Sequence, residues 1–375
     1  MRFLSLLLSL PWLATTHAVA QNSPRGTPVE IVRTPRLSLG VDAGDPNLEF
    51  DQVVTPFLLR DGRVVVPTRG SNSIRVFRAS GQLLSSHGRG GAGPGEFRSI
   101  IAAWARSDTI EVFDNRLSRI TRFLPNGTVE VVTLTTKQRD LSLGAGPLPD
   151  GWIVGGVESA TYPGRDQIVL RRFSRSGADL GEVARVQGFA RYHSPVITGP
   201  EPLSPTPVMD VQNGRGYVAD NLTPRIQIIN ARGQPEREVR WTPERVHPVR
   251  ATLRMVIDSA VARAKPVQAV RTRQRWEDAR VPEQVPVFAS FIVDDQGFIW
   301  VRPFEPLVHA MALGGLNRTG PGGVWTILSP DGVKVGSVKV PDDIEPMQIT
   351  TNALVGIVKD DLGVESVRVH ELKRK

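Results

Sequence analysis

The fold is decided by a pattern that is clearest in residues 109–127, which read TIEVFDNRLSRITRFLPNG. Apolar and polar residues alternate along 109–113 and again along 120–123, and Pro125-Asn126-Gly127 follows the second run. Alternation with a period of two buries one face of a strand, and an Asn-Gly turn joins antiparallel neighbours. This stretch therefore predicts short antiparallel strands joined by tight turns.

The same unit recurs along the chain, and its best copies share one spacing. In these copies a valine precedes an isoleucine by eight residues. The pairs are Val66 and Ile74, Val112 and Ile120, and Val218 and Ile226. The six copies occupy residues 62–81, 109–127, 150–177, 216–233, 295–332 and 353–370. A β-solenoid needs shorter and more uniform repeats, and a sandwich shows none. We therefore predict an all-β fold, a six-bladed β-propeller.

Two further features concern how the units are joined. The loop 93–97, GPGEF, leads into the second unit, and a degenerate copy at 45–50 leads into the first. We expect Phe97 and Phe50 to pack between neighbouring sheets. The apolar run 29–32 has no partner of its own, and the last unit lacks an outer strand. Pairing these two ends would close the ring and remove the exposed sheet edges.

Residues 90–97, 112–115 and 118–120 resemble the NHL-type six-bladed β-propellers. They are most similar to exported bacterial propeller proteins whose loops read G-x-G-P-G-E-F, and residues 355–369 resemble the closing segment of that group. The resemblance implies a fold but no single activity, since propellers of this type host unrelated functions.

A helical insertion is predicted between the fourth and fifth blades, over residues 242–282. Thr242-Pro243-Glu244 has the pattern of a helix start, and apolar residues then recur at helical spacing from Leu253 to Val261. Pro266 breaks the run, and a second helix is expected over 267–280. We favour an insert packed on the blade edge; the alternative is a lid or a partner-docking arm.

The N-terminus and the composition place the chain outside the cytoplasm. Residues 1–20 have the pattern of a signal peptide that ends at Ala18-Val19-Ala20, which leaves a mature domain of 21–375 in the periplasm or secreted. The absence of cysteine excludes disulfides, a thiolate nucleophile, a Cys-ligated zinc and a lipoprotein anchor. We expect no membrane span and no nucleic-acid partner, because the net charge of +8 is spread along the chain. We also expect a monomer.

No catalytic motif survives its context. The match Gly88–Gly93 to G-x-G-x-x-G is followed by Pro94-Gly95 instead of a helix, so nucleotide binding is not expected. Asp114-Asn115 and Asp220-Asn221 recur just after a strand, and Arg119 and Arg225 recur just before the next. We favour structural bridges between these arginines and aspartates. The alternative is that Arg119, Arg225, Asp114, Asp220 and Asp210 line a channel mouth, where the arginines would bind an anion.

Three functions remain open. We favour an exported, non-enzymatic module that binds a small-molecule or protein ligand, without a cofactor. The alternative is a metal-dependent hydrolase or lyase at the channel mouth, as in related six-bladed lactonases, with Asp114, Asp210, Asp220 and Asp294 as metal ligands. A carbohydrate binder is the third, although most tryptophans lie within the expected strands. A calcium ion bound by Asp42, Asp45, Glu49 and Asp51 is an alternative to a simple turn cluster.

Overall fold

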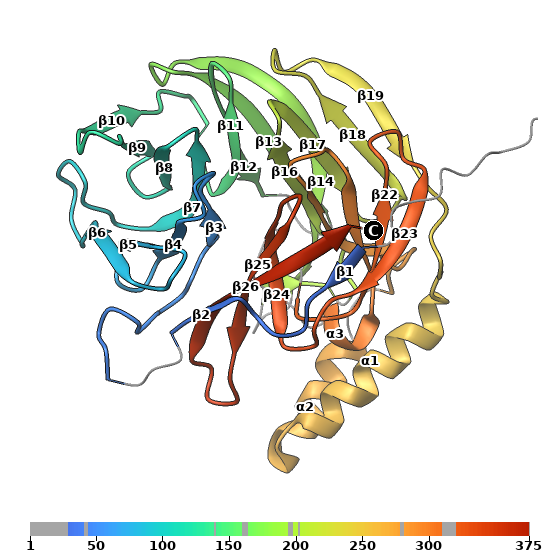
Figure 1. The fold of residues 1–375 in the computed structure, drawn as a ribbon. Coiled ribbons are helices and arrows are strands. Elements are labelled where there is room, and N and C mark those ends of the chain that lie inside the picture. Colours follow the sequence, from blue (N-terminus) through green and yellow to red (C-terminus); the bar gives the residue numbers. More distant parts are fainter. Residues whose placement is uncertain are drawn as a thin grey trace, which may run out of the picture.

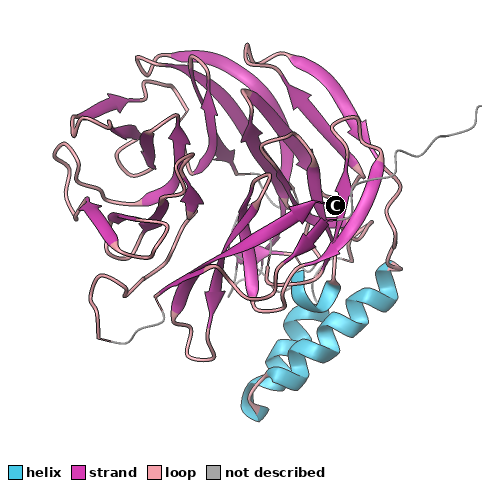
Figure 2. Ribbon diagram, in the orientation of Figure 1, coloured by secondary structure: helices cyan, strands magenta, loops and turns pink. Residues whose placement is uncertain are grey.

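The computed structural model of the protein describes residues 29–40, 44–138, 140–159, 164–193, 198–201, 203–277, 281–309 and 320–374. The signal peptide predicted at 1–20 and Asp42 of the acidic group lie outside these residues. Six antiparallel sheets surround a central axis, with a helical hairpin beside them (Figures 1 and 2). The predicted six-bladed β-propeller is confirmed.

Blades 1 to 3 follow one another along the chain, and in each the first strand lies innermost. Blade 1 consists of β3 (Phe57–Leu58), β4 (Val64–Thr68), β5 (Ser73–Phe77) and β6 (Leu83–His87). Blade 2 consists of β7 (Ile100–Arg106), β8 (Thr109–Asp114), β9 (Arg119–Phe123) and β10 (Val129–Thr133). Blade 3 consists of β11 (Leu143–Leu148), β12 (Gly151–Glu158), β13 (Arg165–Ser174), β14 (Asp179–His193) and β15 (Thr198–Pro200).

Blades 4 to 6 complete the ring. Blade 4 consists of β16 (Pro207–Gln212), β17 (Arg215–Asp220), β18 (Arg225–Ile229) and β19 (Pro235–Arg240). Blade 5 consists of β20 (Phe288–Val293), β21 (Ile299–Pro303), β22 (Val324–Leu328) and β23 (Lys334–Lys339). Blade 6 consists of β24 (Ile344–Ile349), β25 (Ala353–Lys359), β26 (Glu365–Arg374) and β1 (Val29–Ile31), and β2 (Leu37–Leu39) also pairs with β26.

The ring is closed by the two ends of the chain, as predicted. β1 forms the outer strand of blade 6, with Val29 opposite Arg374 and Ile31 opposite Leu372. Because Ile31 and Leu372 are both buried in the same apolar cluster, closure adds packing as well as backbone hydrogen bonds.

The core lies between the blades. Six of the apolar clusters in the described residues each join two neighbouring blades, and a seventh lies under the first helix. Phe97 is fully buried between blades 1 and 2, and Phe50 packs between blades 6 and 1, as the loop repeat predicted. The six valine and isoleucine positions that define the repeat spacing are all buried.

The insertion between blades 4 and 5 forms α1 (Val249–Arg263) and α2 (Pro266–Glu277). The helix start predicted at Thr242 is wrong, because Pro248 would interrupt any helix that began there: it lacks an N–H and disfavours the helical conformation at His247. Pro248 instead takes an extended conformation as the N-cap of α1.

α1 packs against the propeller and α2 projects from it (Figure 1). The buried face of α1 includes Leu253, Val256 and Ile257, in one cluster with Leu203 and Phe304. α1 therefore packs on the segment before blade 4 and on the segment after β21, and the choice between an edge insert and a lid stays a prediction. The short α3 (Pro306–His309) follows β21. None of the helices within the described residues has the length and apolar character to cross a membrane.

Candidate functional site

A channel of about 1100 Å³ runs along the axis of the propeller. Its wall is formed by residues from the first strand of every blade: β3, β7, β11, β16, β20 and β24. Ala103, Trp104, Met209, Phe291 and Met347 contribute apolar surface to it. Trp104 is partly exposed there, whereas Trp152, Trp300 and Trp325 are buried between blades.

Several of the polar lining residues lie at one end of the channel, which we call the mouth. The first strands of the blades begin there, and so do the loops that follow the second strands. One residue after the second strand contributes to the lining in four of the blades. These residues are Arg69, Asn115, Asn221 and Phe304.

The repeat explains one of these residues and leaves another unexplained. In blade 4, the side-chain oxygen of Asn221 accepts a hydrogen bond from Thr206 N at 2.8 Å, just before β16. In blade 2, the equivalent amide of Ser99 donates to Asp114 at 3.3 Å. Asn115, the counterpart of Asn221, therefore does not accept a hydrogen bond from the residue that precedes the first strand. Its Oδ1 is buried and accepts no hydrogen bond among the described residues.

Two arginines flank Asn115 at the mouth. Nε of Arg69 donates to Ile100 O at 3.0 Å, and Asn115 N donates to Ser99 O at 3.3 Å, so both residues are anchored at the start of β7. Arg116 follows directly in the chain. Both arginines are exposed, and neither forms an ion pair within the described part of the chain.

Acidic groups also line the channel, but two of them are engaged. Oε2 of Glu365 accepts the N–H of Val53, and Oε1 pairs with Lys359 Nζ at 2.7 Å. Glu345 is buried and accepts a hydrogen bond from Gly320 N at 3.0 Å. Both groups lie in blade 6.

Asp210 is the acidic group deeper in the channel. Its Oδ1 accepts from Val211 N and its Oδ2 from Val293 N, both at 2.8 Å, so it joins blades 4 and 5. Desolvation by burial raises its pKa to about 6, against the lowering effect of these two hydrogen bonds. Among the five residues proposed from the sequence for a channel mouth, Asp210 is the one that lines the channel.

Asp114 and Arg119 are structural in their contacts. Asp114 is fully buried and accepts hydrogen bonds from the backbone N–H groups of Arg98, Ser99 and Leu117. Arg119 is 7% exposed and donates to the carbonyls of Ala92, Gly93 and Glu96 in the GPGEF loop. The expected Arg119–Asp114 bridge is wrong, since the terminal nitrogens of the guanidinium donate to these carbonyls instead, while Nε is buried without a partner among the described residues.

The second pair also fails to form a bridge. Asp220 Oδ1 accepts from Leu222 N at 3.2 Å, whereas Arg225 pairs with Glu238 at 3.5 Å. The Arg225 side chain is 46% exposed, because the segment before blade 4 has no GPGEF loop to receive it. Arg225 and Asp220 do not belong to the channel lining.

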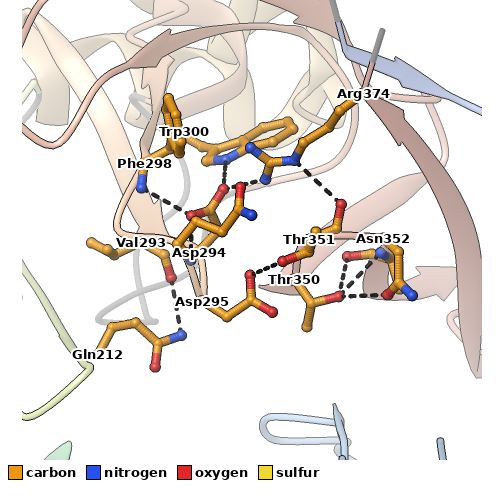
Figure 3. Close-up of polar contacts among 12 residues, drawn as sticks. Gln212, Val293, Asp294, Asp295, Phe298, Trp300, Thr350, Thr351, Asn352 and Arg374 are labelled. Atoms are coloured by element: carbon orange, nitrogen blue, oxygen red, sulfur yellow. Dashed lines mark hydrogen bonds and ion pairs between the residues drawn. The ribbon is translucent and has the colours of Figure 1, made fainter. Parts of the chain in front are cut away.

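Asp294 lies on a different face, in the network of Figure 3. Its fully buried carboxylate accepts hydrogen bonds from Phe298 N and Trp300 Nε1 and pairs with Arg374. The four aspartates considered as metal ligands therefore do not converge. No three His, Asp or Glu side chains of the described residues gather closely enough to share a metal ion. The residues present do not fit the metal site considered, and Asp45 of the acidic group caps its own turn at Asn47 N.

No pattern in the sequence pointed to Arg69 and Arg116. They are two arginines in an arginine-rich chain, and no other unit has an arginine at the equivalent position. Asn115 was noticed only as part of a recurring pair. The residues that follow the second strands can be recognised as equivalent only from the strand pairing within each blade. In blade 2 the start of the first strand, Ile100, pairs with the end of the second, Asp114, and in blade 4 Pro207 pairs with Asp220 in the same way.

Comparisons with known proteins support the fold. No protein-family model and no curated protein sequence matches the chain. A member of the DUF4221 family from Bacteroides vulgatus is 10% identical, with a TM-score of 0.54 over 94% of this chain and all of that one.

Two other propellers superimpose less closely. Virginiamycin B lyase from Staphylococcus aureus is 10% identical, with a TM-score of 0.44 over 93% of this chain and 100% of that one. The calcium-binding protein regucalcin from Agrobacterium tumefaciens is 11% identical, with a TM-score of 0.40 over 88% and 93%. Because the TM-scores of these two are below 0.5, only the likeness to the DUF4221 protein bears on the fold, and at about 10% identity none of the three bears on function. The chain is thus similar to propeller-type proteins, and its resemblance to the NHL group stays a prediction.

Proposed function

We propose that this chain is an exported binding protein that holds a small-molecule ligand in its central channel, without catalysing a reaction. The observation that carries the proposal is the channel itself. About 1100 Å³ exceeds what side-chain packing leaves empty in an interior, and it suits a ligand of drug-like size.

The chemistry of the lining favours binding over catalysis. Within the described residues, the carboxylates of the lining are engaged by backbone N–H groups or by a lysine, and no nucleophile-and-base pair is formed with them. The metal-dependent alternative would require ligands from several blades, but only Asp210 of the aspartates considered reaches the channel. A partly exposed tryptophan, Trp104, adds a flat apolar surface on which a ring could stack.

Obstruction of the mouth tests the proposal. Ser142 lies just before β11 and lines the channel, and its hydroxyl donates to the exposed Asp140. Ser142→Trp should fill the mouth at little cost in stability. Ser80→Trp, on an exposed outer turn, is the matched control. Thermal shifts with a small-molecule panel should identify compounds that stabilise the wild type and the control but not Ser142→Trp.

Two outcomes would contradict the proposal. One is a panel in which every compound that stabilises the wild type stabilises Ser142→Trp equally. The other is turnover of a stabilising compound, seen by mass spectrometry of the incubation mixture, which would make the chain an enzyme. Export is tested separately, by the mass of the protein recovered from the periplasm or the medium, which should begin at Gln21.

A further inference from the structure

Four polar side chains at the mouth, Arg69, Ser99, Asn115 and Arg116, form what we call the arginine rim. All four line the channel, and they belong to blade 2 or to the end of β4 in blade 1. Arg69 and Asn115 are both anchored at the start of β7, through the neighbouring carbonyls of Ile100 and Ser99. The rim is therefore positioned by the inner strand of a blade.

The rim has hydrogen-bond donors to spare. Nε of Arg69 donates to Ile100 O, but the two terminal nitrogens of this guanidinium have no partner among the described residues. The guanidinium of Arg116 has no partner there at any of its three nitrogens. Asn115 has a buried side-chain oxygen without a partner, and a half-turn of the amide presents its nitrogen instead. Two guanidinium groups and an amide within one concavity are the donors that carboxylate and phosphate oxygens require.

The comparison with other arginines in the chain argues against a purely structural role. Arg119 and Arg302 are buried, and each directs its guanidinium to several loop carbonyls. Arg122 and Arg106 pair with the buried Glu111. Arg69 has a single carbonyl partner, Ile100 O, and Arg116 has none among the described residues, although both line the channel at its mouth.

The surroundings add positive potential to the same mouth. α1 packs on Leu203 and Phe304, which both line the channel. Residues 249–277 of the helical hairpin include seven lysines and arginines but only two acidic residues. Such a potential raises the local concentration of anions and their rate of association. The acidic lining residues Glu345 and Glu365 belong to blade 6, which adjoins blade 1, and both are already engaged, by Gly320 N and by Lys359 and Val53 N respectively.

We infer that the arginine rim binds the anionic group of the channel ligand, which is a small organic carboxylate or phosphate. This inference rests on the proposed function, because it places the remainder of the ligand deeper in the channel. Carboxylate and phosphate share the chemistry that the rim would recognise, so both are tested.

Inorganic phosphate and citrate are suitable probes, titrated by calorimetry at constant ionic strength with sodium chloride. The test variant is Arg69→Gln with Arg116→Gln. The control is Arg60→Gln with Arg78→Gln, which removes the same charge from two exposed arginines outside the channel lining. We expect saturable binding of at least one probe to the wild type and the control, and at least a tenfold weaker affinity in the test variant.

Equal affinity in the two double variants would overturn the inference, as would the absence of saturable binding of both probes to the wild type. The proposed function has a different signature of failure. If neutral compounds bind and are blocked by Ser142→Trp while the arginine variants bind them normally, the channel function stands and the anion site is wrong. If anion binding survives Ser142→Trp but not the arginine substitutions, the rim binds anions at the surface and the channel is not the ligand site.

Discussion

The guanidinium of Arg374, at the end of β26, lies against the buried carboxylate of Asp294 in the neighbouring blade (Figure 3). Asp294 is fully buried, and Arg374 also lies over the Phe298 ring, 5.3 Å from its centroid. The end of β26 is thus bound to blade 5 by an ion pair, in addition to its backbone pairing with β1.

Substitution of Arg374 by alanine should destabilise the propeller by about 3 kcal/mol, since it leaves a buried carboxylate without its cation. Lys373→Ala is the control, because that neighbouring side chain is exposed. Chemical denaturation of both variants measures the effect. Equal midpoints would show that Asp294 is satisfied by Phe298 N and Trp300 Nε1 alone.

Removal of residues 21–37 should lower the melting temperature of the whole domain. The deletion takes β1 from blade 6, exposes the edge of β26 and uncovers the apolar surface around Leu372, at about 25 cal/mol per Å². Removal of residues 21–27 alone, which stops before β1, is the control. An unchanged melting temperature in the longer deletion would show that the pairing of β1 with β26 does not stabilise the ring.

Arg119→Ala should cost about 3 kcal/mol, because three loop carbonyls lose a buried, charged donor. The repeat supplies the control: Arg225→Ala removes the equivalent side chain, which is 46% exposed, and should cost no more than about 1 kcal/mol. The two variants are compared by thermal melts. A smaller loss for Arg119→Ala than for Arg225→Ala would contradict the assigned contacts.

The raised pKa of Asp210 makes stability depend on pH in a known direction. Its pKa is about 6 in the folded protein against an ordinary value of 3.8 for aspartate, so between about pH 4 and pH 6 the folded state binds more protons than the unfolded state. Stability from this residue is therefore present below pH 4 and is lost as the pH rises through 6, by at most about 3 kcal/mol.

Asp210→Asn should remove that slope, although it also loses one of the two backbone hydrogen bonds and is less stable at low pH. Urea denaturation of both proteins from pH 4 to pH 7 gives the two profiles. Parallel profiles would mean that Asp210 ionises at its ordinary pKa in the folded protein.

The introduction of a charge should destabilise the protein much more in α1 than in α2. Val256→Asp in α1 places a charge in a fully buried position and should cost several kcal/mol, since an unpaired charge is expensive to bury. Val270→Asp in α2 should change stability by less than about 0.5 kcal/mol, because Val270 is 75% exposed. Circular dichroism melts of the two variants decide the matter; similar losses would show that α2 is packed as closely as α1.

The sequence predicted the blades because their information is local. Val112 and Ile120 lie on adjacent strands of one hairpin, and their spacing reports the strand length and the loop between them. The same holds for Phe97, whose loop precedes its blade directly. Chain closure was also predictable, because an unpaired strand and an incomplete last unit complement each other.

The candidate site depends on contacts that no local pattern reports. Glu365 binds Val53 N from a position 312 residues further along the chain, and Arg374 meets Asp294 across 80 residues. Arg119 was chosen for its recurrence, but recurrence marks what every blade needs for its structure. Residues that differ between blades, such as Arg69 and Arg116, are free to serve a ligand, and a search for repeats passes over them.

The pairing of Val29 with Arg374 sets an order of events during folding. The strand that completes the last blade is made first, and its partner is made last. β1 therefore reaches the folding compartment before its partner, and until β26 follows it has an open edge and no neighbour. The intermediate blades can form in turn, but the ring stays open until the final strand arrives. A chaperone that covers β1 during this interval would act on the stage at which the chain is most exposed to aggregation.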